Sequence, residues 1–430
     1  MKRFVVLLAV LAVSCGGLFA DADFGVAIDT STFLSSGVVD TTYYSQYKGA
    51  LWGELSQQTS KGGSLDLIAQ ASYRYTAERP YIFDLDLLRF KGLFSAAFGE
   101  GTAVELTAGR FEFNDTTRLI LDQTLDGVQV SFQFTNFQVR LAGAYSGLIL
   151  NPSSNVRISA DDISETNDNA VFFGPKRIIT QVFLGSDGLG LEGLAQFDLR
   201  GAGATELINT QYLGIVGVPL LFPGLYLDYN LTASYGQSTI SSKTTDILSA
   251  LAGFGFRVYA EQLASSRAHL KVMYATGFTP LVLLLNNLSL DNFRPITQPT
   301  LGLAFSPPLA NLLYADFGYS FRPFAGNPST TLANIEPLVE ALVFFRDPLP
   351  LLLGGTAASF PNVVLTDMNP GSNALYLGTE IDAGVAARLL SDFGATVTGG
   401  VFVPSTGPSA AFTSNRGLGY VLKIDISAAM

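Results

Sequence analysis

Residues 125–135 have the sequence LDGVQVSFQFT, and this stretch decides the fold class. From residue 128 onward apolar and polar side chains alternate without exception, with Val128, Val130, Phe132 and Phe134 on one parity and Gln129, Ser131, Gln133 and Thr135 on the other. Successive side chains of a β-strand point to opposite faces of a sheet. The stretch therefore predicts a strand with one apolar face and one polar face.

The same alternation returns along the whole chain. We predict strands near residues 24–34, 45–57, 64–76, 82–98, 103–113, 125–135, 138–147, 177–186, 191–199, 225–236, 246–259, 266–277, 297–306, 312–322, 334–346, 373–388, 392–403 and 417–428. Within 103–113, Phe111 and Phe113 have the opposite parity to Val104 and Leu106, which predicts a bulge at Gly109.

Composition places these strands in a membrane. Hydrophobic residues make up 48% of the chain and charged residues 14%, against about 25% charged in ordinary soluble domains. After the N-terminus there is no apolar run of the ~20 residues that a membrane helix needs. Because a lipid-embedded sheet tolerates no open edge, the fold class that we predict is all-β, a closed antiparallel transmembrane β-barrel of about 16–18 strands.

The N-terminus has the pattern of a secretory signal. Lys2 and Arg3 precede a short apolar run, and cleavage after Ala20 would leave residues 21–430 as a single barrel domain. An alternative is lipidation at Cys15, which follows a relaxed lipobox. Cys15 is the only cysteine, so residues 21–430 can form no disulfide. The predicted location is the outer membrane of a diderm bacterium, with outer-membrane lipid and the barrel-assembly machinery as partners.

Connection lengths alternate as they do in outer-membrane barrels. Connections after the fourth, sixth and eighth predicted strands are short, whereas those after the fifth and seventh are long. This is the pattern of a barrel with both termini in the periplasm. The segment near 148–176 is therefore expected to be a long extracellular loop. Barrels occur as monomers and as trimers, so the oligomeric state stays open.

The charged residues define the expected interior. The formal net charge is -11, with 36 acidic and 25 basic residues, which disfavours nucleic acid as a partner because phosphate contacts need clustered Lys and Arg. By strand parity we predict a pore lined by charges of both signs: Arg74, Arg140, Asp228, Arg257, Asp316, Arg322, Glu380 and Asp382.

An acidic group lies in the long connection. Asp161, Asp162, Glu165 and Asp168 follow one another closely. Two interpretations remain open, a constriction loop folded into the pore and a solvated surface loop.

No motif for chemistry is evident. The only histidine, His269, lies on the polar parity of its strand, and the sequence offers it neither a nucleophile nor a second metal-binding histidine. We expect it to be a structural lumen residue. No catalytic residue, cofactor or metal site is predicted, and the protein is not expected to be an enzyme.

Three stretches are apolar on both parities: 212–222, 281–290 and 349–353. They are compatible with bulged strands, with hydrophobic loop tips, or with the lining of an apolar passage.

A resemblance adds to this interpretation. Ala108-Gly109-Arg110-Phe111, followed by Asp126-Gly127-Val128, resembles bacterial outer-membrane porins, most closely the alginate-export type of channel. The resemblance covers about 25 residues, and it implies that Arg110 and Arg118 lie near a pore. The chain departs from the family in its acidic charge and in ending on Met430 without a terminal aromatic residue.

These observations favour a channel that passes small solutes by diffusion through a lumen of mixed charge. One alternative is a transporter of hydrophobic compounds of the lipid or fatty-acid type, with 212–222 and 281–290 along its route. Another is a surface adhesin or structural barrel that binds a partner through the loop near 148–176.

Overall fold

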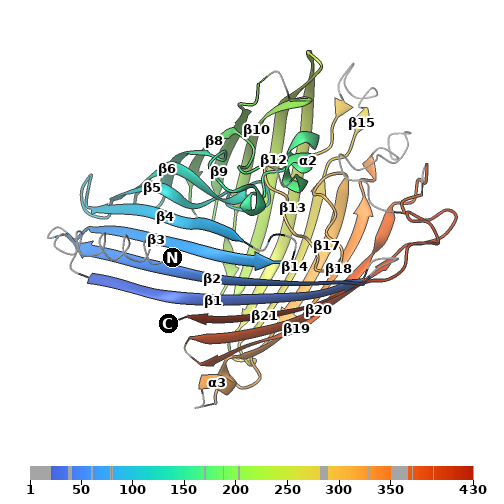
Figure 1. Cartoon of the computed structure of the whole chain (residues 1–430). Helices are drawn as coiled ribbons and strands as arrows, with labels where there is room; N and C mark the ends of the chain where they lie inside the picture. The colour runs from blue at the N-terminus through green and yellow to red at the C-terminus, as the bar shows by residue number, and fades with distance from the viewer. Residues whose placement is uncertain are drawn as a thin grey trace.

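The computed structural model is a closed antiparallel barrel of 18 strands (Figure 1). It describes residues 21–36, 41–59, 62–77, 79, 81–168, 171–186, 188–201, 204–280, 289–327, 330–349, 367–369, 371–390 and 392–429. The expected signal peptide 1–20 with Cys15, and the segments 281–288 and 350–353, lie outside the described residues. Among the described residues, no helix is long and apolar enough to cross a membrane.

The barrel strands follow one another around the wall in chain order. The first ten are β1 (Asp21–Ser36), β2 (Thr41–Gln58), β3 (Ser64–Thr76), β4 (Ile82–Ser95), β5 (Ala103–Asn114), β6 (Asp122–Gln133), β7 (Gln138–Tyr145), β8 (Arg177–Gly185), β9 (Gly190–Asp198) and β10 (Glu206–Gly217). The others are β12 (Leu225–Ile240), β13 (Lys243–Ala260), β14 (Ser266–Ala275), β17 (Leu312–Ser320), β18 (Ile335–Arg346), β19 (Tyr376–Leu390), β20 (Phe393–Pro404) and β21 (Gly419–Ala429).

Short elements lie in the connections between these strands. They are β11 (Leu220–Phe222), which pairs with β12, β15 (Thr279–Pro280), β16 (Ser289–Leu290), η1 (Asn151–Ser153), α2 (Ala160–Asn167) and α3 (Thr330–Ala333).

The first and last strands close the sheet. β1 pairs with β21 in antiparallel register from Ala27 opposite Ala429 to Ser36 opposite Tyr420, so blue β1 and red β21 lie side by side in Figure 1. Because every neighbouring pair is antiparallel, the connections 146–176, 276–311, 347–375 and 405–418 all leave the end of the barrel opposite the termini. The other end carries mainly short turns, such as 134–137 and 186–189.

The wall shows the expected two-faced strands. In β10 the outward Leu213 is 66% exposed while Tyr212 beside it is 3% exposed. Tyr212 and Val216 face inward, and Leu213 and Ile215 face outward. The stretch 212–222 is apolar on both parities because its inward side chains pack on segments inside the barrel, not because it contains a bulge between 212 and 217.

Three connections fold into the barrel and hydrogen-bond to one another. Ile296 donates its backbone N–H to the carbonyl of Ile120 at 2.8 Å, and Arg157 donates to the carbonyl of Ile296 at 3.2 Å. Val156 and Thr297 form a β-bridge. The connections 115–121, 146–176 and 291–311 are thus tied together inside the wall. Their apolar residues, including Leu121, Val156 and Phe293, are fully buried in one cluster with inward wall residues.

Two local predictions are wrong, and the strand β10 is missing from the predicted set. Residues 297–306 form no strand but belong to an inward connection, where Phe305 is buried against the wall. Gly109 makes no bulge, because β5 keeps one register with β6 from Ala103 to Asn114. Phe111 and Phe113 instead occupy inward positions and are apolar because they pack on the folded connections. In both cases an apolar core inside the barrel replaced the polar interior that the parity argument assumed.

Candidate functional site inside the barrel

The connection 146–176 is anchored by buried ion pairs. Helix α2 starts at Ser159, whose hydroxyl accepts from the backbone of Asp162, while the Asp162 carboxylate accepts from the backbone of Ser159. The same carboxylate lies 2.8 Å from Arg177 on β8 and 3.1 Å from Arg200. Arg177 also lies 3.0 Å from Asp198. The side chains of Arg177, Asp162 and Asp198 are fully shielded from solvent.

The acidic residues in this connection therefore do not all have the same role. Asp161 accepts hydrogen bonds from the backbone of Thr205 and Glu206 at 2.8 and 3.1 Å. Asp161 and Asp162 thus bind the connection to the wall, whereas Asp168 is exposed. Of the two interpretations of this segment, the solvated loop does not hold for Asp162, which is buried inside the molecule.

The pKa values of two groups in this connection shift in opposite directions. Partial burial acts to raise the pKa of Asp161, but the hydrogen bonds from Thr205 and Glu206 and the charge of Arg200 outweigh it and lower that pKa below 3.8. Burial raises the pKa of Glu165 above 4.5, although Arg200 opposes the shift. Asp161 is therefore the stronger acid of the two.

A row of charged side chains crosses the inner wall from β12 to β19. Arg257 on β13 forms an ion pair with Asp228 on β12. His269 on β14 lies 3.1 Å from Asp316 on β17. Glu380 on β19 accepts the backbone N–H groups of Ala304 and Phe305 at 2.6 and 2.8 Å, which joins the inward connection to the wall.

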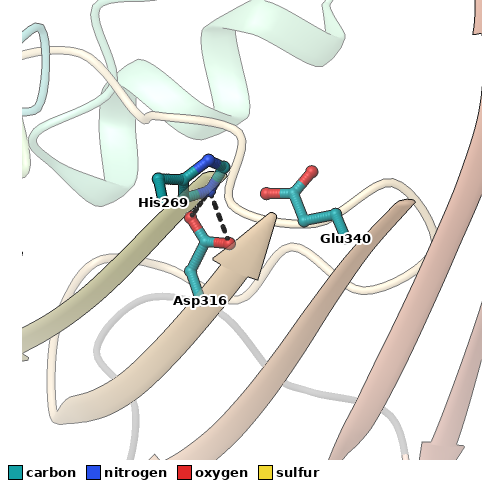
Figure 2. A group of neighbouring side chains, drawn as sticks. All are labelled: His269, Asp316 and Glu340. Atoms are coloured by element: carbon teal, nitrogen blue, oxygen red, sulfur yellow. Dashed lines mark hydrogen bonds and ion pairs between the residues drawn. The ribbon is translucent and has the colours of Figure 1, made fainter. Parts of the chain in front are cut away.

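Glu340 completes a group that sequence reasoning missed. One ligand-type atom each of His269, Asp316 and Glu340 lies within 4.8 Å of the others. Figure 2 shows the Glu340 carboxylate facing the His269–Asp316 pair from the next strand. Glu340 has the inward parity of β18 and stands opposite Asp382 in the register, so the parity argument applied to β18 would have found it.

Gly318 creates the space for this group. In the register it stands between His269 on β14 and Glu340 on β18. A Cβ atom at Gly318 would overlap the His269 ring. The imidazole therefore lies over bare backbone, which brings it close to both carboxylates.

Three further arginines that were predicted to line the pore have different partners. Arg74 donates to the hydroxyl of Ser153 in the inward connection. Arg140 lies 3.6 Å from Glu192 and 5.3 Å from the ring centre of Phe183. Arg322 pairs with Glu336 at 2.9 Å close to the turn that contains α3. All three guanidinium groups therefore have a partner.

Arg110 has a structural position instead. The pairing of β4 with β5 stops at Leu88 opposite Arg110, and the guanidinium occupies the point where the two strands separate. It binds both carboxylate oxygens of Asp126 at 3.0 and 2.7 Å and donates to the carbonyls of Leu85 and Leu148. Arg118 is exposed and pairs with Glu112 at 2.7 Å.

A cavity connects the charged wall to the inward connections. It has a volume of about 290 Å³ and is lined by Thr116 and Thr117 of the connection 115–121 and by His269, Lys271 and Asp316 of the wall. A separate aromatic group fills the interior near β18 and β20, where Phe305 stacks on Phe402 at 4.0 Å between ring centres. The interior thus has one polar region and one apolar region.

The sequence matches no protein-family model and no curated protein. Solved structures are similar over almost the whole chain. OccK11 (OpdR) of Pseudomonas aeruginosa has a TM-score of 0.57 at 11% identity and is covered over 96% of each chain. OccK2 (OpdF) of Pseudomonas aeruginosa in complex with glucuronate has a TM-score of 0.56 at 12% identity, over 96% of this chain and 98% of that chain. The fold is shared. At 11–12% identity, the similarity shows only that the backbones share one fold.

Proposed function

We propose that this chain is an outer-membrane porin of a diderm bacterium that passes small solutes by diffusion. The observation that carries the proposal is the closed barrel of 18 strands with apolar side chains outward and connections folded into its interior. An apolar outer surface on a closed sheet is what lipid requires of strands that cross it. The similarity to the OccK and Opd porins over the full length supports the same function.

Selectivity would come from an interior with charges of both signs. Arg74 and Arg140 stand on β3 and β7, whereas Asp316, Glu340 and Asp382 stand on β17, β18 and β19. A solute that passes between these walls would meet charges of both signs, with Arg140 beside Glu192 on one side and Asp316 opposite Lys271 on the other. The solved complex of OccK2 with glucuronate makes small charged organic solutes the first class to test.

The sidedness follows from the same proposal. Residues 1–20 would be the signal peptide, the termini would face the periplasm, and the connection 146–176 would enter the barrel from the extracellular end. Outer-membrane lipid and the barrel-assembly machinery would be its partners during insertion.

Planar-bilayer conductance of the purified protein tests the proposal. We expect stepwise ohmic openings, and the reversal potential in a salt gradient should shift when Asp316 is changed to Asn. The matched control is Glu100→Gln. This substitution removes a charge in the exposed turn 96–102, which lies at the end of the barrel away from the connection 146–176. Absence of openings from an inserted, heat-modifiable barrel would refute a diffusion channel.

The apolar region of the interior favours a second candidate, a transporter of hydrophobic compounds. Phe293, Phe344, Phe402 and Phe412 are all fully buried inside the barrel, and a passage opened between them would suit an acyl chain better than a hydrated ion. Extraction of purified protein should then release a bound long-chain lipid or fatty acid. A barrel that conducts ions and releases no lipid would exclude this candidate.

A further inference from the structure

We propose that His269, Asp316 and Glu340 form a binding site for one divalent transition-metal cation of the Zn²⁺ type. The three residues come from neighbouring strands, β14, β17 and β18, and all face inward. Their ligand-type atoms lie within 4.8 Å of one another. The proposal concerns binding and does not depend on whether the barrel conducts.

The geometry is close to that of a coordination shell. His269 Nε2 lies 3.1 Å from each oxygen of Asp316. Two ligands of a tetrahedral zinc ion, each at about 2.1 Å from the metal, are roughly 3.4 Å apart. The imidazole–carboxylate pair therefore already has the spacing that a shared cation requires. A small rotation of Glu340 would bring a second carboxylate oxygen into the same shell.

The wall is shaped to permit this arrangement. Gly318 separates His269 from Glu340 in the register, and a side chain at Gly318 would collide with the imidazole. With no Cβ in between, His269 and Glu340 face each other across bare backbone (Figure 2). The remaining coordination positions would open toward the interior and be filled by water or by a passing ligand.

The donor set selects the class of ion. One imidazole nitrogen with two carboxylate oxygens suits Zn²⁺ and similar first-row divalent ions, whereas Mg²⁺ and Ca²⁺ prefer oxygen ligands alone. The cation would replace the proton that His269 and Asp316 share in their hydrogen bond, so two carboxylates would balance its charge.

The surroundings add negative charge. Asp382 stands opposite Glu340 in the register, and it is 4% exposed. Its Oδ1 atom is buried and has no hydrogen-bond partner among the described residues. The nearest opposing charges are Lys271, which stands opposite Asp316 in the register, and Arg257, which is already paired with Asp228. The carboxylates of Asp316, Glu340 and Asp382 therefore stand on three neighbouring strands around this point, with Lys271 opposite Asp316.

The single histidine makes the test direct. The untagged full-length protein, labelled with ¹⁵N-histidine and held in detergent, is titrated with ZnCl₂ alone. We expect the His269 ring nitrogen signals to shift in proportion to one Zn²⁺ per chain. Glu340→Gln should weaken the affinity at least tenfold. The matched control is Glu336→Gln, the same substitution on the same strand at a carboxylate that pairs with Arg322, and its affinity should be unchanged.

Two further variants test the site independently of Glu340, and the folding of every variant is checked first. His269→Asn, in which zinc binding is measured by equilibrium dialysis because the only histidine is gone, should abolish binding, and Lys271→Met, which removes a repelling charge, should tighten it. Each variant is used only after its heat-modifiable mobility matches that of the wild type. Zinc that leaves the His269 signals unmoved would overturn the proposal. Equal affinities in Glu340→Gln and Glu336→Gln would also overturn it, because His269 and Asp316 would then form only a structural ion pair.

Discussion

Arg177 Nη2 lies 2.8 Å from Asp162 Oδ2, and neither side chain is exposed to solvent. Asp162 belongs to the connection that folds into the barrel, and Arg177 belongs to the wall. Arg177 also donates to the side-chain oxygen of Gln196 at 2.8 Å and to the carbonyl of Ile208 at 3.0 Å. This ion pair therefore joins the inward connection to three strands of the barrel.

Removing this anchor should loosen the connection. In Asp162→Ala the buried Arg177 loses one of its two carboxylate partners but keeps Asp198, so the cost should be less than the about 3–5 kcal/mol of leaving a buried charge unpaired. We expect faster amide hydrogen exchange across residues 156–167 and noisier channel currents, while the wall strands stay protected. Glu100→Ala at the other end of the barrel is the control. Unchanged exchange in Asp162→Ala would mean that the other contacts of the connection hold it without this ion pair.

Arg110 should stabilise the barrel at the point where β4 and β5 separate. Arg110→Ala leaves Asp126 and two carbonyls without their donor, so we expect a lower temperature for the heat-induced mobility shift. Arg110→Lys should restore little, because an ammonium group cannot bind Asp126 through two parallel hydrogen bonds. The double variant Arg110→Ala, Asp126→Ala should be less unstable than the two single effects added together. Simple additivity would show that the pair is not coupled.

Gly318 should tolerate no side chain. Gly318→Ala places a methyl group against the His269 ring, and overpacking of this kind costs about 1–3 kcal/mol. Gly326→Ala is the matched control, since a Cβ there meets nothing within 4 Å. Thermal unfolding in detergent compares the two. Equal transition temperatures would show that the imidazole moves aside without cost.

Asp161 and Glu165 should make the docking of the connection 146–176 depend on pH in opposite directions. The pKa of Asp161 is lowered, so its contribution to docking is present above pH 3.8 and is lost as pH falls through the lower folded value. The pKa of Glu165 is raised, so its contribution is present below pH 4.5 and is lost as pH rises. At pH 7 we therefore expect Asp161→Asn to speed amide exchange in α2 and Glu165→Gln to slow it.

The same experiment at low pH checks this assignment. Near pH 3 Glu165→Gln should match the wild type, because the glutamate is then protonated in both the folded and the unfolded state. A difference between Glu165→Gln and the wild type that persists at low pH would show that the substitution acts through packing and not through charge.

A charged substitution on the outward face should destabilise the barrel more the closer it lies to the bilayer midplane. Leu231 on β12 is outward and 59% exposed, and an arginine near the bilayer midplane costs about 2–4 kcal/mol. Gln237 has the same face and the same strand but lies nearer its end, where the cost falls to about 0–1 kcal/mol. Urea-dependent folding into lipid vesicles should separate Leu231→Arg from Gln237→Arg. Equal penalties would place Leu231 outside the hydrocarbon layer.

Alternation alone was sufficient to predict most strands of the wall. The side-chain period of a strand is two, and lipid on one side forces apolar residues onto every outward position, so segments such as 64–76 and 225–236 could be assigned from their letters. The barrel class and the upper end of the expected strand number are confirmed by the structure. The alternation misled where the inside is apolar as well, at Phe111, Phe113 and residues 297–306, and it left β10 (Glu206–Gly217) unassigned.

The interior was decided by tertiary structure. Asp162 and Arg177 meet because a connection turns back into the barrel, and no local pattern encodes that turn. His269, Asp316 and Glu340 lie far apart in sequence and meet through the register of three strands, in which a shift by one residue would turn each side chain toward lipid. The sequence by itself determined which face of each strand meets lipid, because that depends on neighbours along the chain. Only the closed sheet and its folded connections decided which inward groups touch, because those contacts depend on the pairing of distant segments.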